Sequence, residues 1–245
     1  MARIIYVKRV RISSRGVRLV GWLTTPQNAG LKLPAVLIIH GWGSSVVPSY
    51  LERAKAISRK GFVCLVVALR GHAGSSGTIA HVTRNEHLAD ACAAYDFLLN
   101  QKGVDRSRIG VFGTSYGGYL AMLLSSKRNV AWLALRAPAL YRDEGFRFST
   151  QLAIENLRDY RREYMHFSRN RALKALHAFD GDVLIVAGER DEDVPLQTIE
   201  NVEAACSDKR RVTLRTIPRA DHVLSKKSHR LAANRIITNW VADHR

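Results

Sequence analysis

Residues 108–118 of this 245-residue chain read Arg-Ile-Gly-Val-Phe-Gly-Thr-Ser-Tyr-Gly-Gly, an apolar run followed at once by a serine between glycines. This pattern predicts a strand that turns sharply into a helix, with Ser115 at the turn. Gly113 and Gly117 suit such a turn, because larger residues there would collide with the neighbouring strand and helix. A serine hydroxyl becomes a nucleophile only when it is exposed, placed beside a general base and faced by hydrogen-bond donors. The stretch therefore predicts a nucleophilic serine, although a Gly-rich turn with an inert serine would have the same sequence pattern.

Apolar runs on both sides of this stretch predict a series of strands and helices. We expect strands near 3–12, 17–24, 35–40, 62–69, 108–113, 131–137, 182–188 and 212–218. We expect helices near 47–60, 84–101, 117–127, 195–207 and 226–243. The first two strands alternate, as in a half-exposed antiparallel hairpin, whereas the later ones are continuous apolar runs, typical of parallel strands covered on both faces. The sequence predicts an α/β fold with a mostly parallel eight-stranded sheet and helices on both faces.

Candidate catalytic residues should follow strands directly, because ligands of such sheets bind beyond the carboxyl ends of the strands. Three segments besides Ser115 meet this condition. The loop His-Gly-Trp-Gly at 40–43 could turn a backbone amide toward a substrate oxygen. Asp191 follows the strand at 182–188, and His222 follows the strand at 212–218. Serine, acid and histidine thus occur in one order along the chain, each after a strand.

From about residue 16 onward the chain resembles the α/β-hydrolases, and more narrowly the small esterases related to the prolyl oligopeptidase catalytic domain, in which a Ser-Tyr-Gly-Gly elbow is common. The matching segments are HGWG at 40–43, LRGH at 69–72, RIGVFGTSYGG at 108–118, GERDEDVP at 188–195 and ADH at 220–222. The order serine, aspartate, histidine is also the order of these enzymes. The resemblance implies an α/β-hydrolase fold with Ser115 as nucleophile, His222 as general base, Asp191 as orienting acid, and the amides of Trp42 and Tyr116 as the oxyanion hole.

Two other carboxylates compete with Asp191 for the role of the acid. Glu189 and Asp193 lie in the same loop. Asp191 stands three residues after Gly188, as the family pattern requires, so we favour it. Asp193 fits better as a cap for the helix that begins near Pro195.

The loop at 70–74 departs from the pattern of the relatives. They often carry an aspartate where this chain has Ala68. We expect the hydrogen bonds of this loop to be rearranged without loss of the triad, and we do not assign His72 a catalytic role.

Other polar residues fit structural roles. We expect His40 to be buried at a strand end with a structural hydrogen bond. Asp90 and Asp96, in the helix before the serine strand, are expected to form a solvated face or to tether a loop. No catalytic spacing involves the remaining histidines, His81, His87, His166, His177, His229 and His244.

The residues between the strands near 131–137 and 182–188 are too many for a plain crossover. We expect one domain over 1–245, with a small helical cap inserted at about 139–178. Apolar residues with roughly helical spacing there are Phe146, Phe148, Leu152, Ile154, Leu157, Tyr160, Tyr164 and Phe167. They either line the pocket or only pack the cap onto the body. The arginines of the cap, Arg142, Arg147, Arg158, Arg161 and Arg162, either meet an anionic substrate or belong to the outer surface.

The formal net charge of +17 is spread over several clusters, and no nucleic-acid motif accompanies it, so we expect no specific nucleic-acid partner. Cys64, Cys92 and Cys206 are scattered and odd in number, which favours free thiols in a reducing compartment. The N-terminus lacks a signal-peptide core, and no stretch approaches the length of a membrane span. We therefore expect a cytoplasmic protein without a membrane span.

These features predict a serine hydrolase that cleaves an ester of a small molecule through an acyl-enzyme, with carboxylesterase as the first choice. Thioesterase, acyltransferase and small peptidase activities use the same triad; the peptidase is disfavoured because the chain lacks the large N-terminal propeller of the related oligopeptidases. A non-catalytic ligand receptor or scaffold of this fold is the alternative outside the enzymes, disfavoured because all three triad residues are present. We expect no metal or organic cofactor, since the chemistry needs none and no cluster has ligand spacing.

Overall fold

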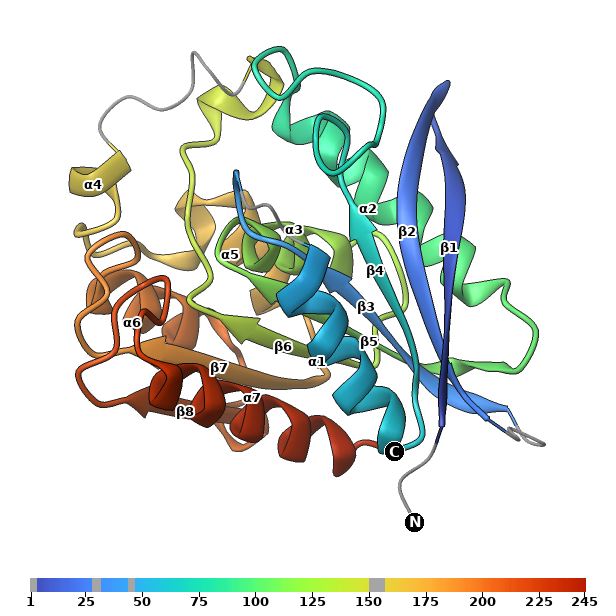
Figure 1. The fold of residues 1–245 in the computed structure, drawn as a ribbon. Coiled ribbons are helices and arrows are strands. Elements are labelled where there is room, and N and C mark those ends of the chain that lie inside the picture. Colours follow the sequence, from blue (N-terminus) through green and yellow to red (C-terminus); the bar gives the residue numbers. More distant parts are fainter. Residues whose placement is uncertain (1–3, 28–31, 44–46, 150–156) are drawn as a thin grey trace.

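Eight strands form one mostly parallel sheet, which confirms the predicted α/β fold (Figure 1). The computed structural model describes residues 4–27, 32–43, 47–149 and 157–245. The strands are β1 (Ile5–Ser14), β2 (Val17–Pro26), β3 (Leu33–Ile39), β4 (Val63–Ala68), β5 (Val104–Thr114), β6 (Trp132–Arg136), β7 (Asp182–Gly188) and β8 (Val212–Ile217). They lie in the order β1-β2-β4-β3-β5-β6-β7-β8. Strand β2 is antiparallel to both β1 and β4, and the pairs from β4 to β8 are parallel.

Helices cover both faces of the sheet (Figure 1). One face is covered by α1 (Val47–Arg59) and α7 (Lys227–Ala242), and the other by α2 (Arg84–Leu99), α3 (Tyr116–Ser125), α5 (Arg171–His177) and α6 (Leu196–Ala205). Along β3, Val36 and Ile38 pack on the first face and Leu37 and Ile39 on the second. The central strands read as continuous apolar runs because both of their faces are buried.

The first two strands form an edge hairpin. Arg15 and Gly16 connect them. Their φ values are positive, 45° and 79°, as the two-residue turns that join antiparallel neighbours commonly require. The outer strand β1 buries alternate residues in its second half, as its sequence predicts. Strand β5 starts at Val104, earlier than expected. Its first residues resemble a turn, since the Ser107 amide donates to Asp105 Oδ1 at 3.0 Å.

The segment between β6 and β7 contains short helices. They are η1 (Glu144–Arg147), α4 (Leu157–Tyr160), η2 (Phe167–Arg169) and α5. Phe146 and Tyr160 are buried in the core, whereas Phe148 and Tyr164 are 60% and 69% exposed. The apolar residues with helical spacing therefore do not share one helix face; Leu152 and Ile154 lie outside the described residues.

Asp90 tethers the loop at 70–74 from within the core. It is fully buried, and it accepts hydrogen bonds from the Arg70 guanidinium at 2.7 Å, the Arg70 amide at 3.0 Å and Ser14 Oγ at 2.6 Å. Asp96 instead pairs with Arg128 at 2.6 Å on the outer side of α2. The prediction of a loop tether is confirmed for Asp90, while its side chain is not solvated.

The three cysteines, Cys64, Cys92 and Cys206, are free thiols. Within the described ranges, no helix combines the length and the apolar character that crossing a membrane requires.

Candidate active site

Ser115 joins β5 to α3 in a strained conformation. Its φ of 52° and ψ of −112° are costly for a residue with a side chain. A Cβ on Gly113 would lie 2.3 Å from the Gly117 carbonyl oxygen, and a Cβ on Gly117 would lie 2.2 Å from the Ile39 carbonyl oxygen. Both distances are far below van der Waals contact. The elbow therefore requires glycine at both positions, as the sequence predicts.

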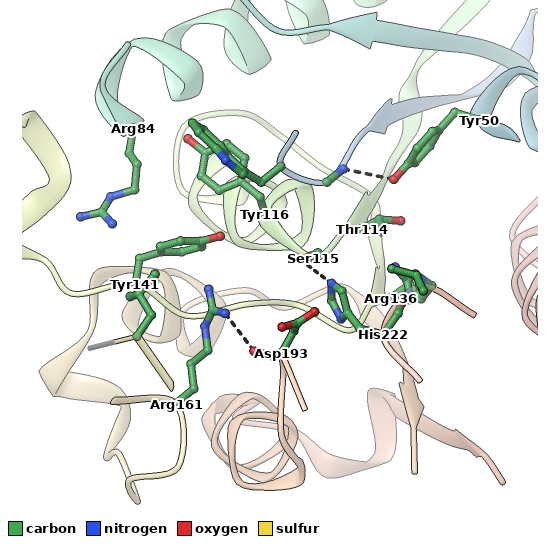
Figure 2. Close-up of a pocket in the computed structure, with 14 residues that line it drawn as sticks. Tyr50, Arg84, Thr114, Ser115, Tyr116, Arg136, Tyr141, Arg161, Asp193 and His222 are labelled. Carbon is green, nitrogen blue, oxygen red and sulfur yellow. Dashed lines mark hydrogen bonds between the residues drawn. The ribbon is translucent and has the colours of Figure 1, made fainter. Parts of the chain in front are cut away.

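His222 lies between Ser115 and Asp191, and Figure 2 shows its ring facing Ser115. The His222 Nδ1 to Asp191 Oδ2 distance is 2.7 Å, and the Nε2 to Ser115 Oγ distance is 3.1 Å. Because a carboxylate can only accept, it favours the tautomer with the proton on Nδ1 and leaves Nε2 free to accept the serine proton. The structure thus brings together three residues that are far apart in sequence, each from a loop after a strand.

Asp191 is fixed by its own loop. It is 7% exposed, and its Oδ1 accepts from the amides of Asp193 at 3.1 Å and Val194 at 2.7 Å. The rival Glu189 instead accepts the Arg219 amide at 2.7 Å. The prediction that Asp193 caps the next helix is wrong. The cap of α6 is Pro195, which has no side-chain acceptor, and the amide of Asp193 serves Asp191 instead.

Arg136 is a site residue that the sequence analysis missed. It ends β6, and its Nη1 donates to the His222 carbonyl oxygen at 2.6 Å. Burial lowers the pKa of Arg136, because desolvation disfavours the charged guanidinium. The contact ties the histidine loop, which follows β8, to the end of β6, two strands away in the sheet. Arg136 lies inside the strand expected near 131–137, so the rule that site residues follow strands did not single it out.

Trp42 and Tyr116, whose amides are expected to form the oxyanion hole, line the same cavity as Ser115. Tyr116 is the first residue of α3, where an amide has no acceptor within the helix. Trp42 follows Gly41, whose amide donates to the Tyr50 hydroxyl at 3.1 Å. The Trp42 and Tyr116 rings meet edge to face, with centroids 5.3 Å apart. This packing connects the loop after β3 to the start of α3.

Three histidines lie buried beside Trp42. The ring centroids of His40 and His72 are 4.6 Å apart, and those of His72 and His87 are 5.7 Å apart. His40 Nδ1 bonds the Gly41 carbonyl at 2.7 Å, and His40 Nε2 accepts the Leu69 amide at 3.1 Å. The expected structural role of His40 is confirmed. Burial lowers the pKa of His40 to about 3, so the imidazole is neutral.

A cavity of about 430 Å³ opens beside Ser115. Its lining combines aromatic, apolar and basic residues, namely Gly41, Trp42, Tyr50, Arg84, Thr114, Ser115, Tyr116, Arg136, Tyr141, Leu157, Arg161, Asp193, His222 and Val223.

Of the five cap arginines considered above, Arg161 lines the cavity. Arg84, at the start of α2, and Tyr141, after β6, were missed. Nothing in their local sequence marks them, because only the folded chain brings them to Ser115. In the described part of the chain, no three His, Cys, Asp or Glu side chains are grouped to hold a metal ion.

Known structures share this architecture. Est1E from Butyrivibrio proteoclasticus, solved with ferulic acid bound, has a TM-score of 0.77 at 20% identity, covering 96% of this chain and 98% of that chain. A dienelactone hydrolase from Anabaena variabilis has a TM-score of 0.71 at 20% identity, covering 96% of each chain. These similarities show that the fold is that of the α/β-hydrolases.

Sequence comparison defines the family. The family model of the prolyl oligopeptidases matches residues 48–245. The uncharacterized protein Rv2307c of Mycobacterium tuberculosis is 31% identical over 213 residues, which cover 84% of this chain and 69% of that protein. The family match spans most of the chain and includes Ser115, Asp191 and His222. The chain therefore belongs to the prolyl oligopeptidase family of serine hydrolases.

Proposed function

We propose that this protein is an esterase that hydrolyses carboxylic esters of small molecules. The observation that carries the proposal is the hydrogen-bonded series Asp191, His222 and Ser115 at a cavity of about 430 Å³. A cavity of this size suits a small molecule. Its mixed aromatic and apolar wall suits an acyl or aryl group.

The proposed reaction has two halves. His222 Nε2 takes the proton of Ser115 while Oγ attacks the ester carbonyl, and the amides of Trp42 and Tyr116 stabilise the oxyanion. The carbon to alkoxy-oxygen bond then breaks, and the leaving alcohol receives the proton from His222. Water, activated by His222, attacks the acyl-enzyme and releases the acid and Ser115. Asp191 stabilises the imidazolium in both halves without taking the proton.

Substitution of the nucleophile tests the proposal directly. We expect Ser115→Ala to lower kcat/KM for 4-nitrophenyl butyrate by about 10⁴-fold or more, because the acyl-enzyme cannot form. A fluorophosphonate probe should label the wild type and not this variant. Ser125→Ala is the matched control, since Ser125 is the last residue of the helix that follows Ser115 and donates to the Met122 carbonyl at 2.7 Å. It should keep both labelling and activity.

The same assay separates the competing activities. We expect 4-nitrophenyl butyrate to be cleaved much faster than the matching 4-nitroanilide. Efficient cleavage of peptidyl anilides with poor ester turnover would identify a peptidase instead. Absence of probe labelling in the wild type would overturn the assignment of Ser115 as an activated nucleophile.

A further inference from the structure

Two arginines flank Tyr141 at the wall of the cavity. Arg84 begins α2, and Arg161 follows α4, so they reach the wall from distant parts of the chain (Figure 2). Their guanidinium carbons lie 5.2 Å and 4.9 Å from the centroid of the Tyr141 ring. All three residues line the cavity that contains Ser115.

The hydrogen bonds found for these guanidinium groups go to neutral acceptors. Arg84 Nη2 donates to the Arg142 carbonyl at 2.7 Å. Arg161 donates through Nε to the Leu140 carbonyl at 3.2 Å and through Nη1 to the Asp193 carbonyl at 2.8 Å. Two other arginines, Arg70 and Arg171, pair with the carboxylates of Asp90 and Asp143. Arg136 instead resembles Arg84 and Arg161, because its hydrogen bond goes to a neutral carbonyl. Over the described ranges, neither Arg84 nor Arg161 has a salt bridge.

Arg84 is the more unusual of the two. It is 2% exposed, and its Nε is buried without an acceptor in the described structure. A buried charge without a counterion, and a buried donor without a partner, each destabilise a fold. The positive end of the α2 dipole adds to this cost, because Arg84 is the first residue of that helix. An anion in the cavity would relieve these costs.

We propose that Arg84, Arg161 and Tyr141 form a carboxylate subsite, and that the substrate is a small ester with a free carboxylate at the end remote from the scissile bond. This inference rests on the esterase function proposed above. Guanidinium groups favour carboxylates because they combine charge with hydrogen-bond geometry. Asp193 also lines the cavity, and its negative charge would repel a substrate carboxylate placed near it. The charges therefore favour substrates whose carboxylate reaches the guanidinium groups beside Tyr141 and stays away from the Asp193 carboxylate.

A pair of substrates of equal chain length tests the subsite. The mono-4-nitrophenyl ester of glutaric acid carries a free carboxylate, and its methyl ester is neutral. We expect the charged member to have at least tenfold higher kcat/KM in the wild type at low salt. The measured quantity is the ratio of the two constants within each variant, so a general loss of activity cancels.

Variants of single arginines test which residues cause the preference for the charged ester. Arg84→Gln and Arg161→Gln should each lower the ratio to within threefold of one. Arg158→Gln and Arg162→Gln are the matched controls, because these exposed arginines belong to the same segment and do not line the cavity. Both controls should keep the wild-type ratio. A wild-type ratio near one, or a ratio unchanged in both cavity variants, would overturn the subsite.

A binding measurement separates this inference from the esterase proposal. In Ser115→Ala, calorimetry should show monomethyl glutarate binding at least tenfold more tightly than dimethyl glutarate. Adding Arg84→Gln should remove the difference. If the wild type hydrolysed neither nitrophenyl ester, the esterase proposal would fail while this experiment still decided the subsite. If both ligands bound equally and both esters were hydrolysed equally, the subsite would fail alone.

Discussion

Asp191 and Asp193 show how two carboxylates of one loop acquire different roles. Asp191 is buried, with one oxygen on His222 and the other on two backbone amides. Asp193 is exposed, and its amide and carbonyl serve Asp191 and Arg161. A carboxylate fixed on both oxygens can hold an imidazole in one orientation. The backbone of Asp193, not its carboxylate, supports the arrangement.

Amide substitutions should separate the two roles. We expect Asp191→Asn to lower kcat/KM for 4-nitrophenyl butyrate by about 10⁴-fold, because an amide favours the wrong histidine tautomer. Asp193→Asn is the matched control, and it should change kcat/KM by less than tenfold. Circular dichroism would show that both variants fold. A larger loss in Asp193→Asn than in Asp191→Asn would mean that the acid has been misassigned.

Strands and turns were predicted best from the sequence where a short stretch of residues is enough to identify them. The continuous apolar runs of β3 and β4 follow from burial on both faces, and the glycines around Ser115 follow from the tight elbow. The start of β5 was placed too late because its first residues resemble a turn. Arg84 could not be found at all. Its place at the cavity depends on how α2 packs across the sheet, which no local pattern encodes.

Helix α7 begins without a favourable cap. Lys226 occupies the cap position with extended backbone (φ −77°, ψ 136°), makes no capping hydrogen bond, and precedes a first turn without acidic residues. Aspartate there would accept an amide hydrogen bond and place a negative charge at the positive helix end. We expect Lys226→Asp to raise the free energy of unfolding by about 1 kcal/mol in urea titrations. Lys226→Ala removes the charge without adding an acceptor, so it should gain less. Equal stability of the two variants would contradict a capping effect.

At the scale of the whole molecule, the buried histidines couple the site to the stability of the fold. His40 lies after β3, His72 after β4 and His87 in α2, so the cluster joins three segments beneath Trp42. His87 Nε2 bonds the Arg70 carbonyl at 3.1 Å, and its Nδ1 bonds the Tyr116 hydroxyl at 2.8 Å. These partners fit a neutral ring that donates from Nε2 and accepts at Nδ1. Protonation would remove that acceptor.

Acid should therefore destabilise the protein through this cluster. Burial lowers the pKa of His87 from 6.5 to about 4; the hydrogen bond with the Arg70 carbonyl and the charge of Asp90 oppose the shift, and the charges of His72 and Arg70 add to it. Between these values the unfolded chain binds more protons, so stability is full above about pH 6.5 and is lost as the pH falls toward 4. One such group changes the free energy of unfolding by at most about 1.4 kcal/mol per pH unit. Urea titrations from pH 7 to 4.5 should show a shallower pH dependence in His87→Gln than in the wild type, whereas the exposed control His81→Gln should match the wild-type slope. An unchanged slope in His87→Gln would mean that the folded protein does not hold this ring neutral.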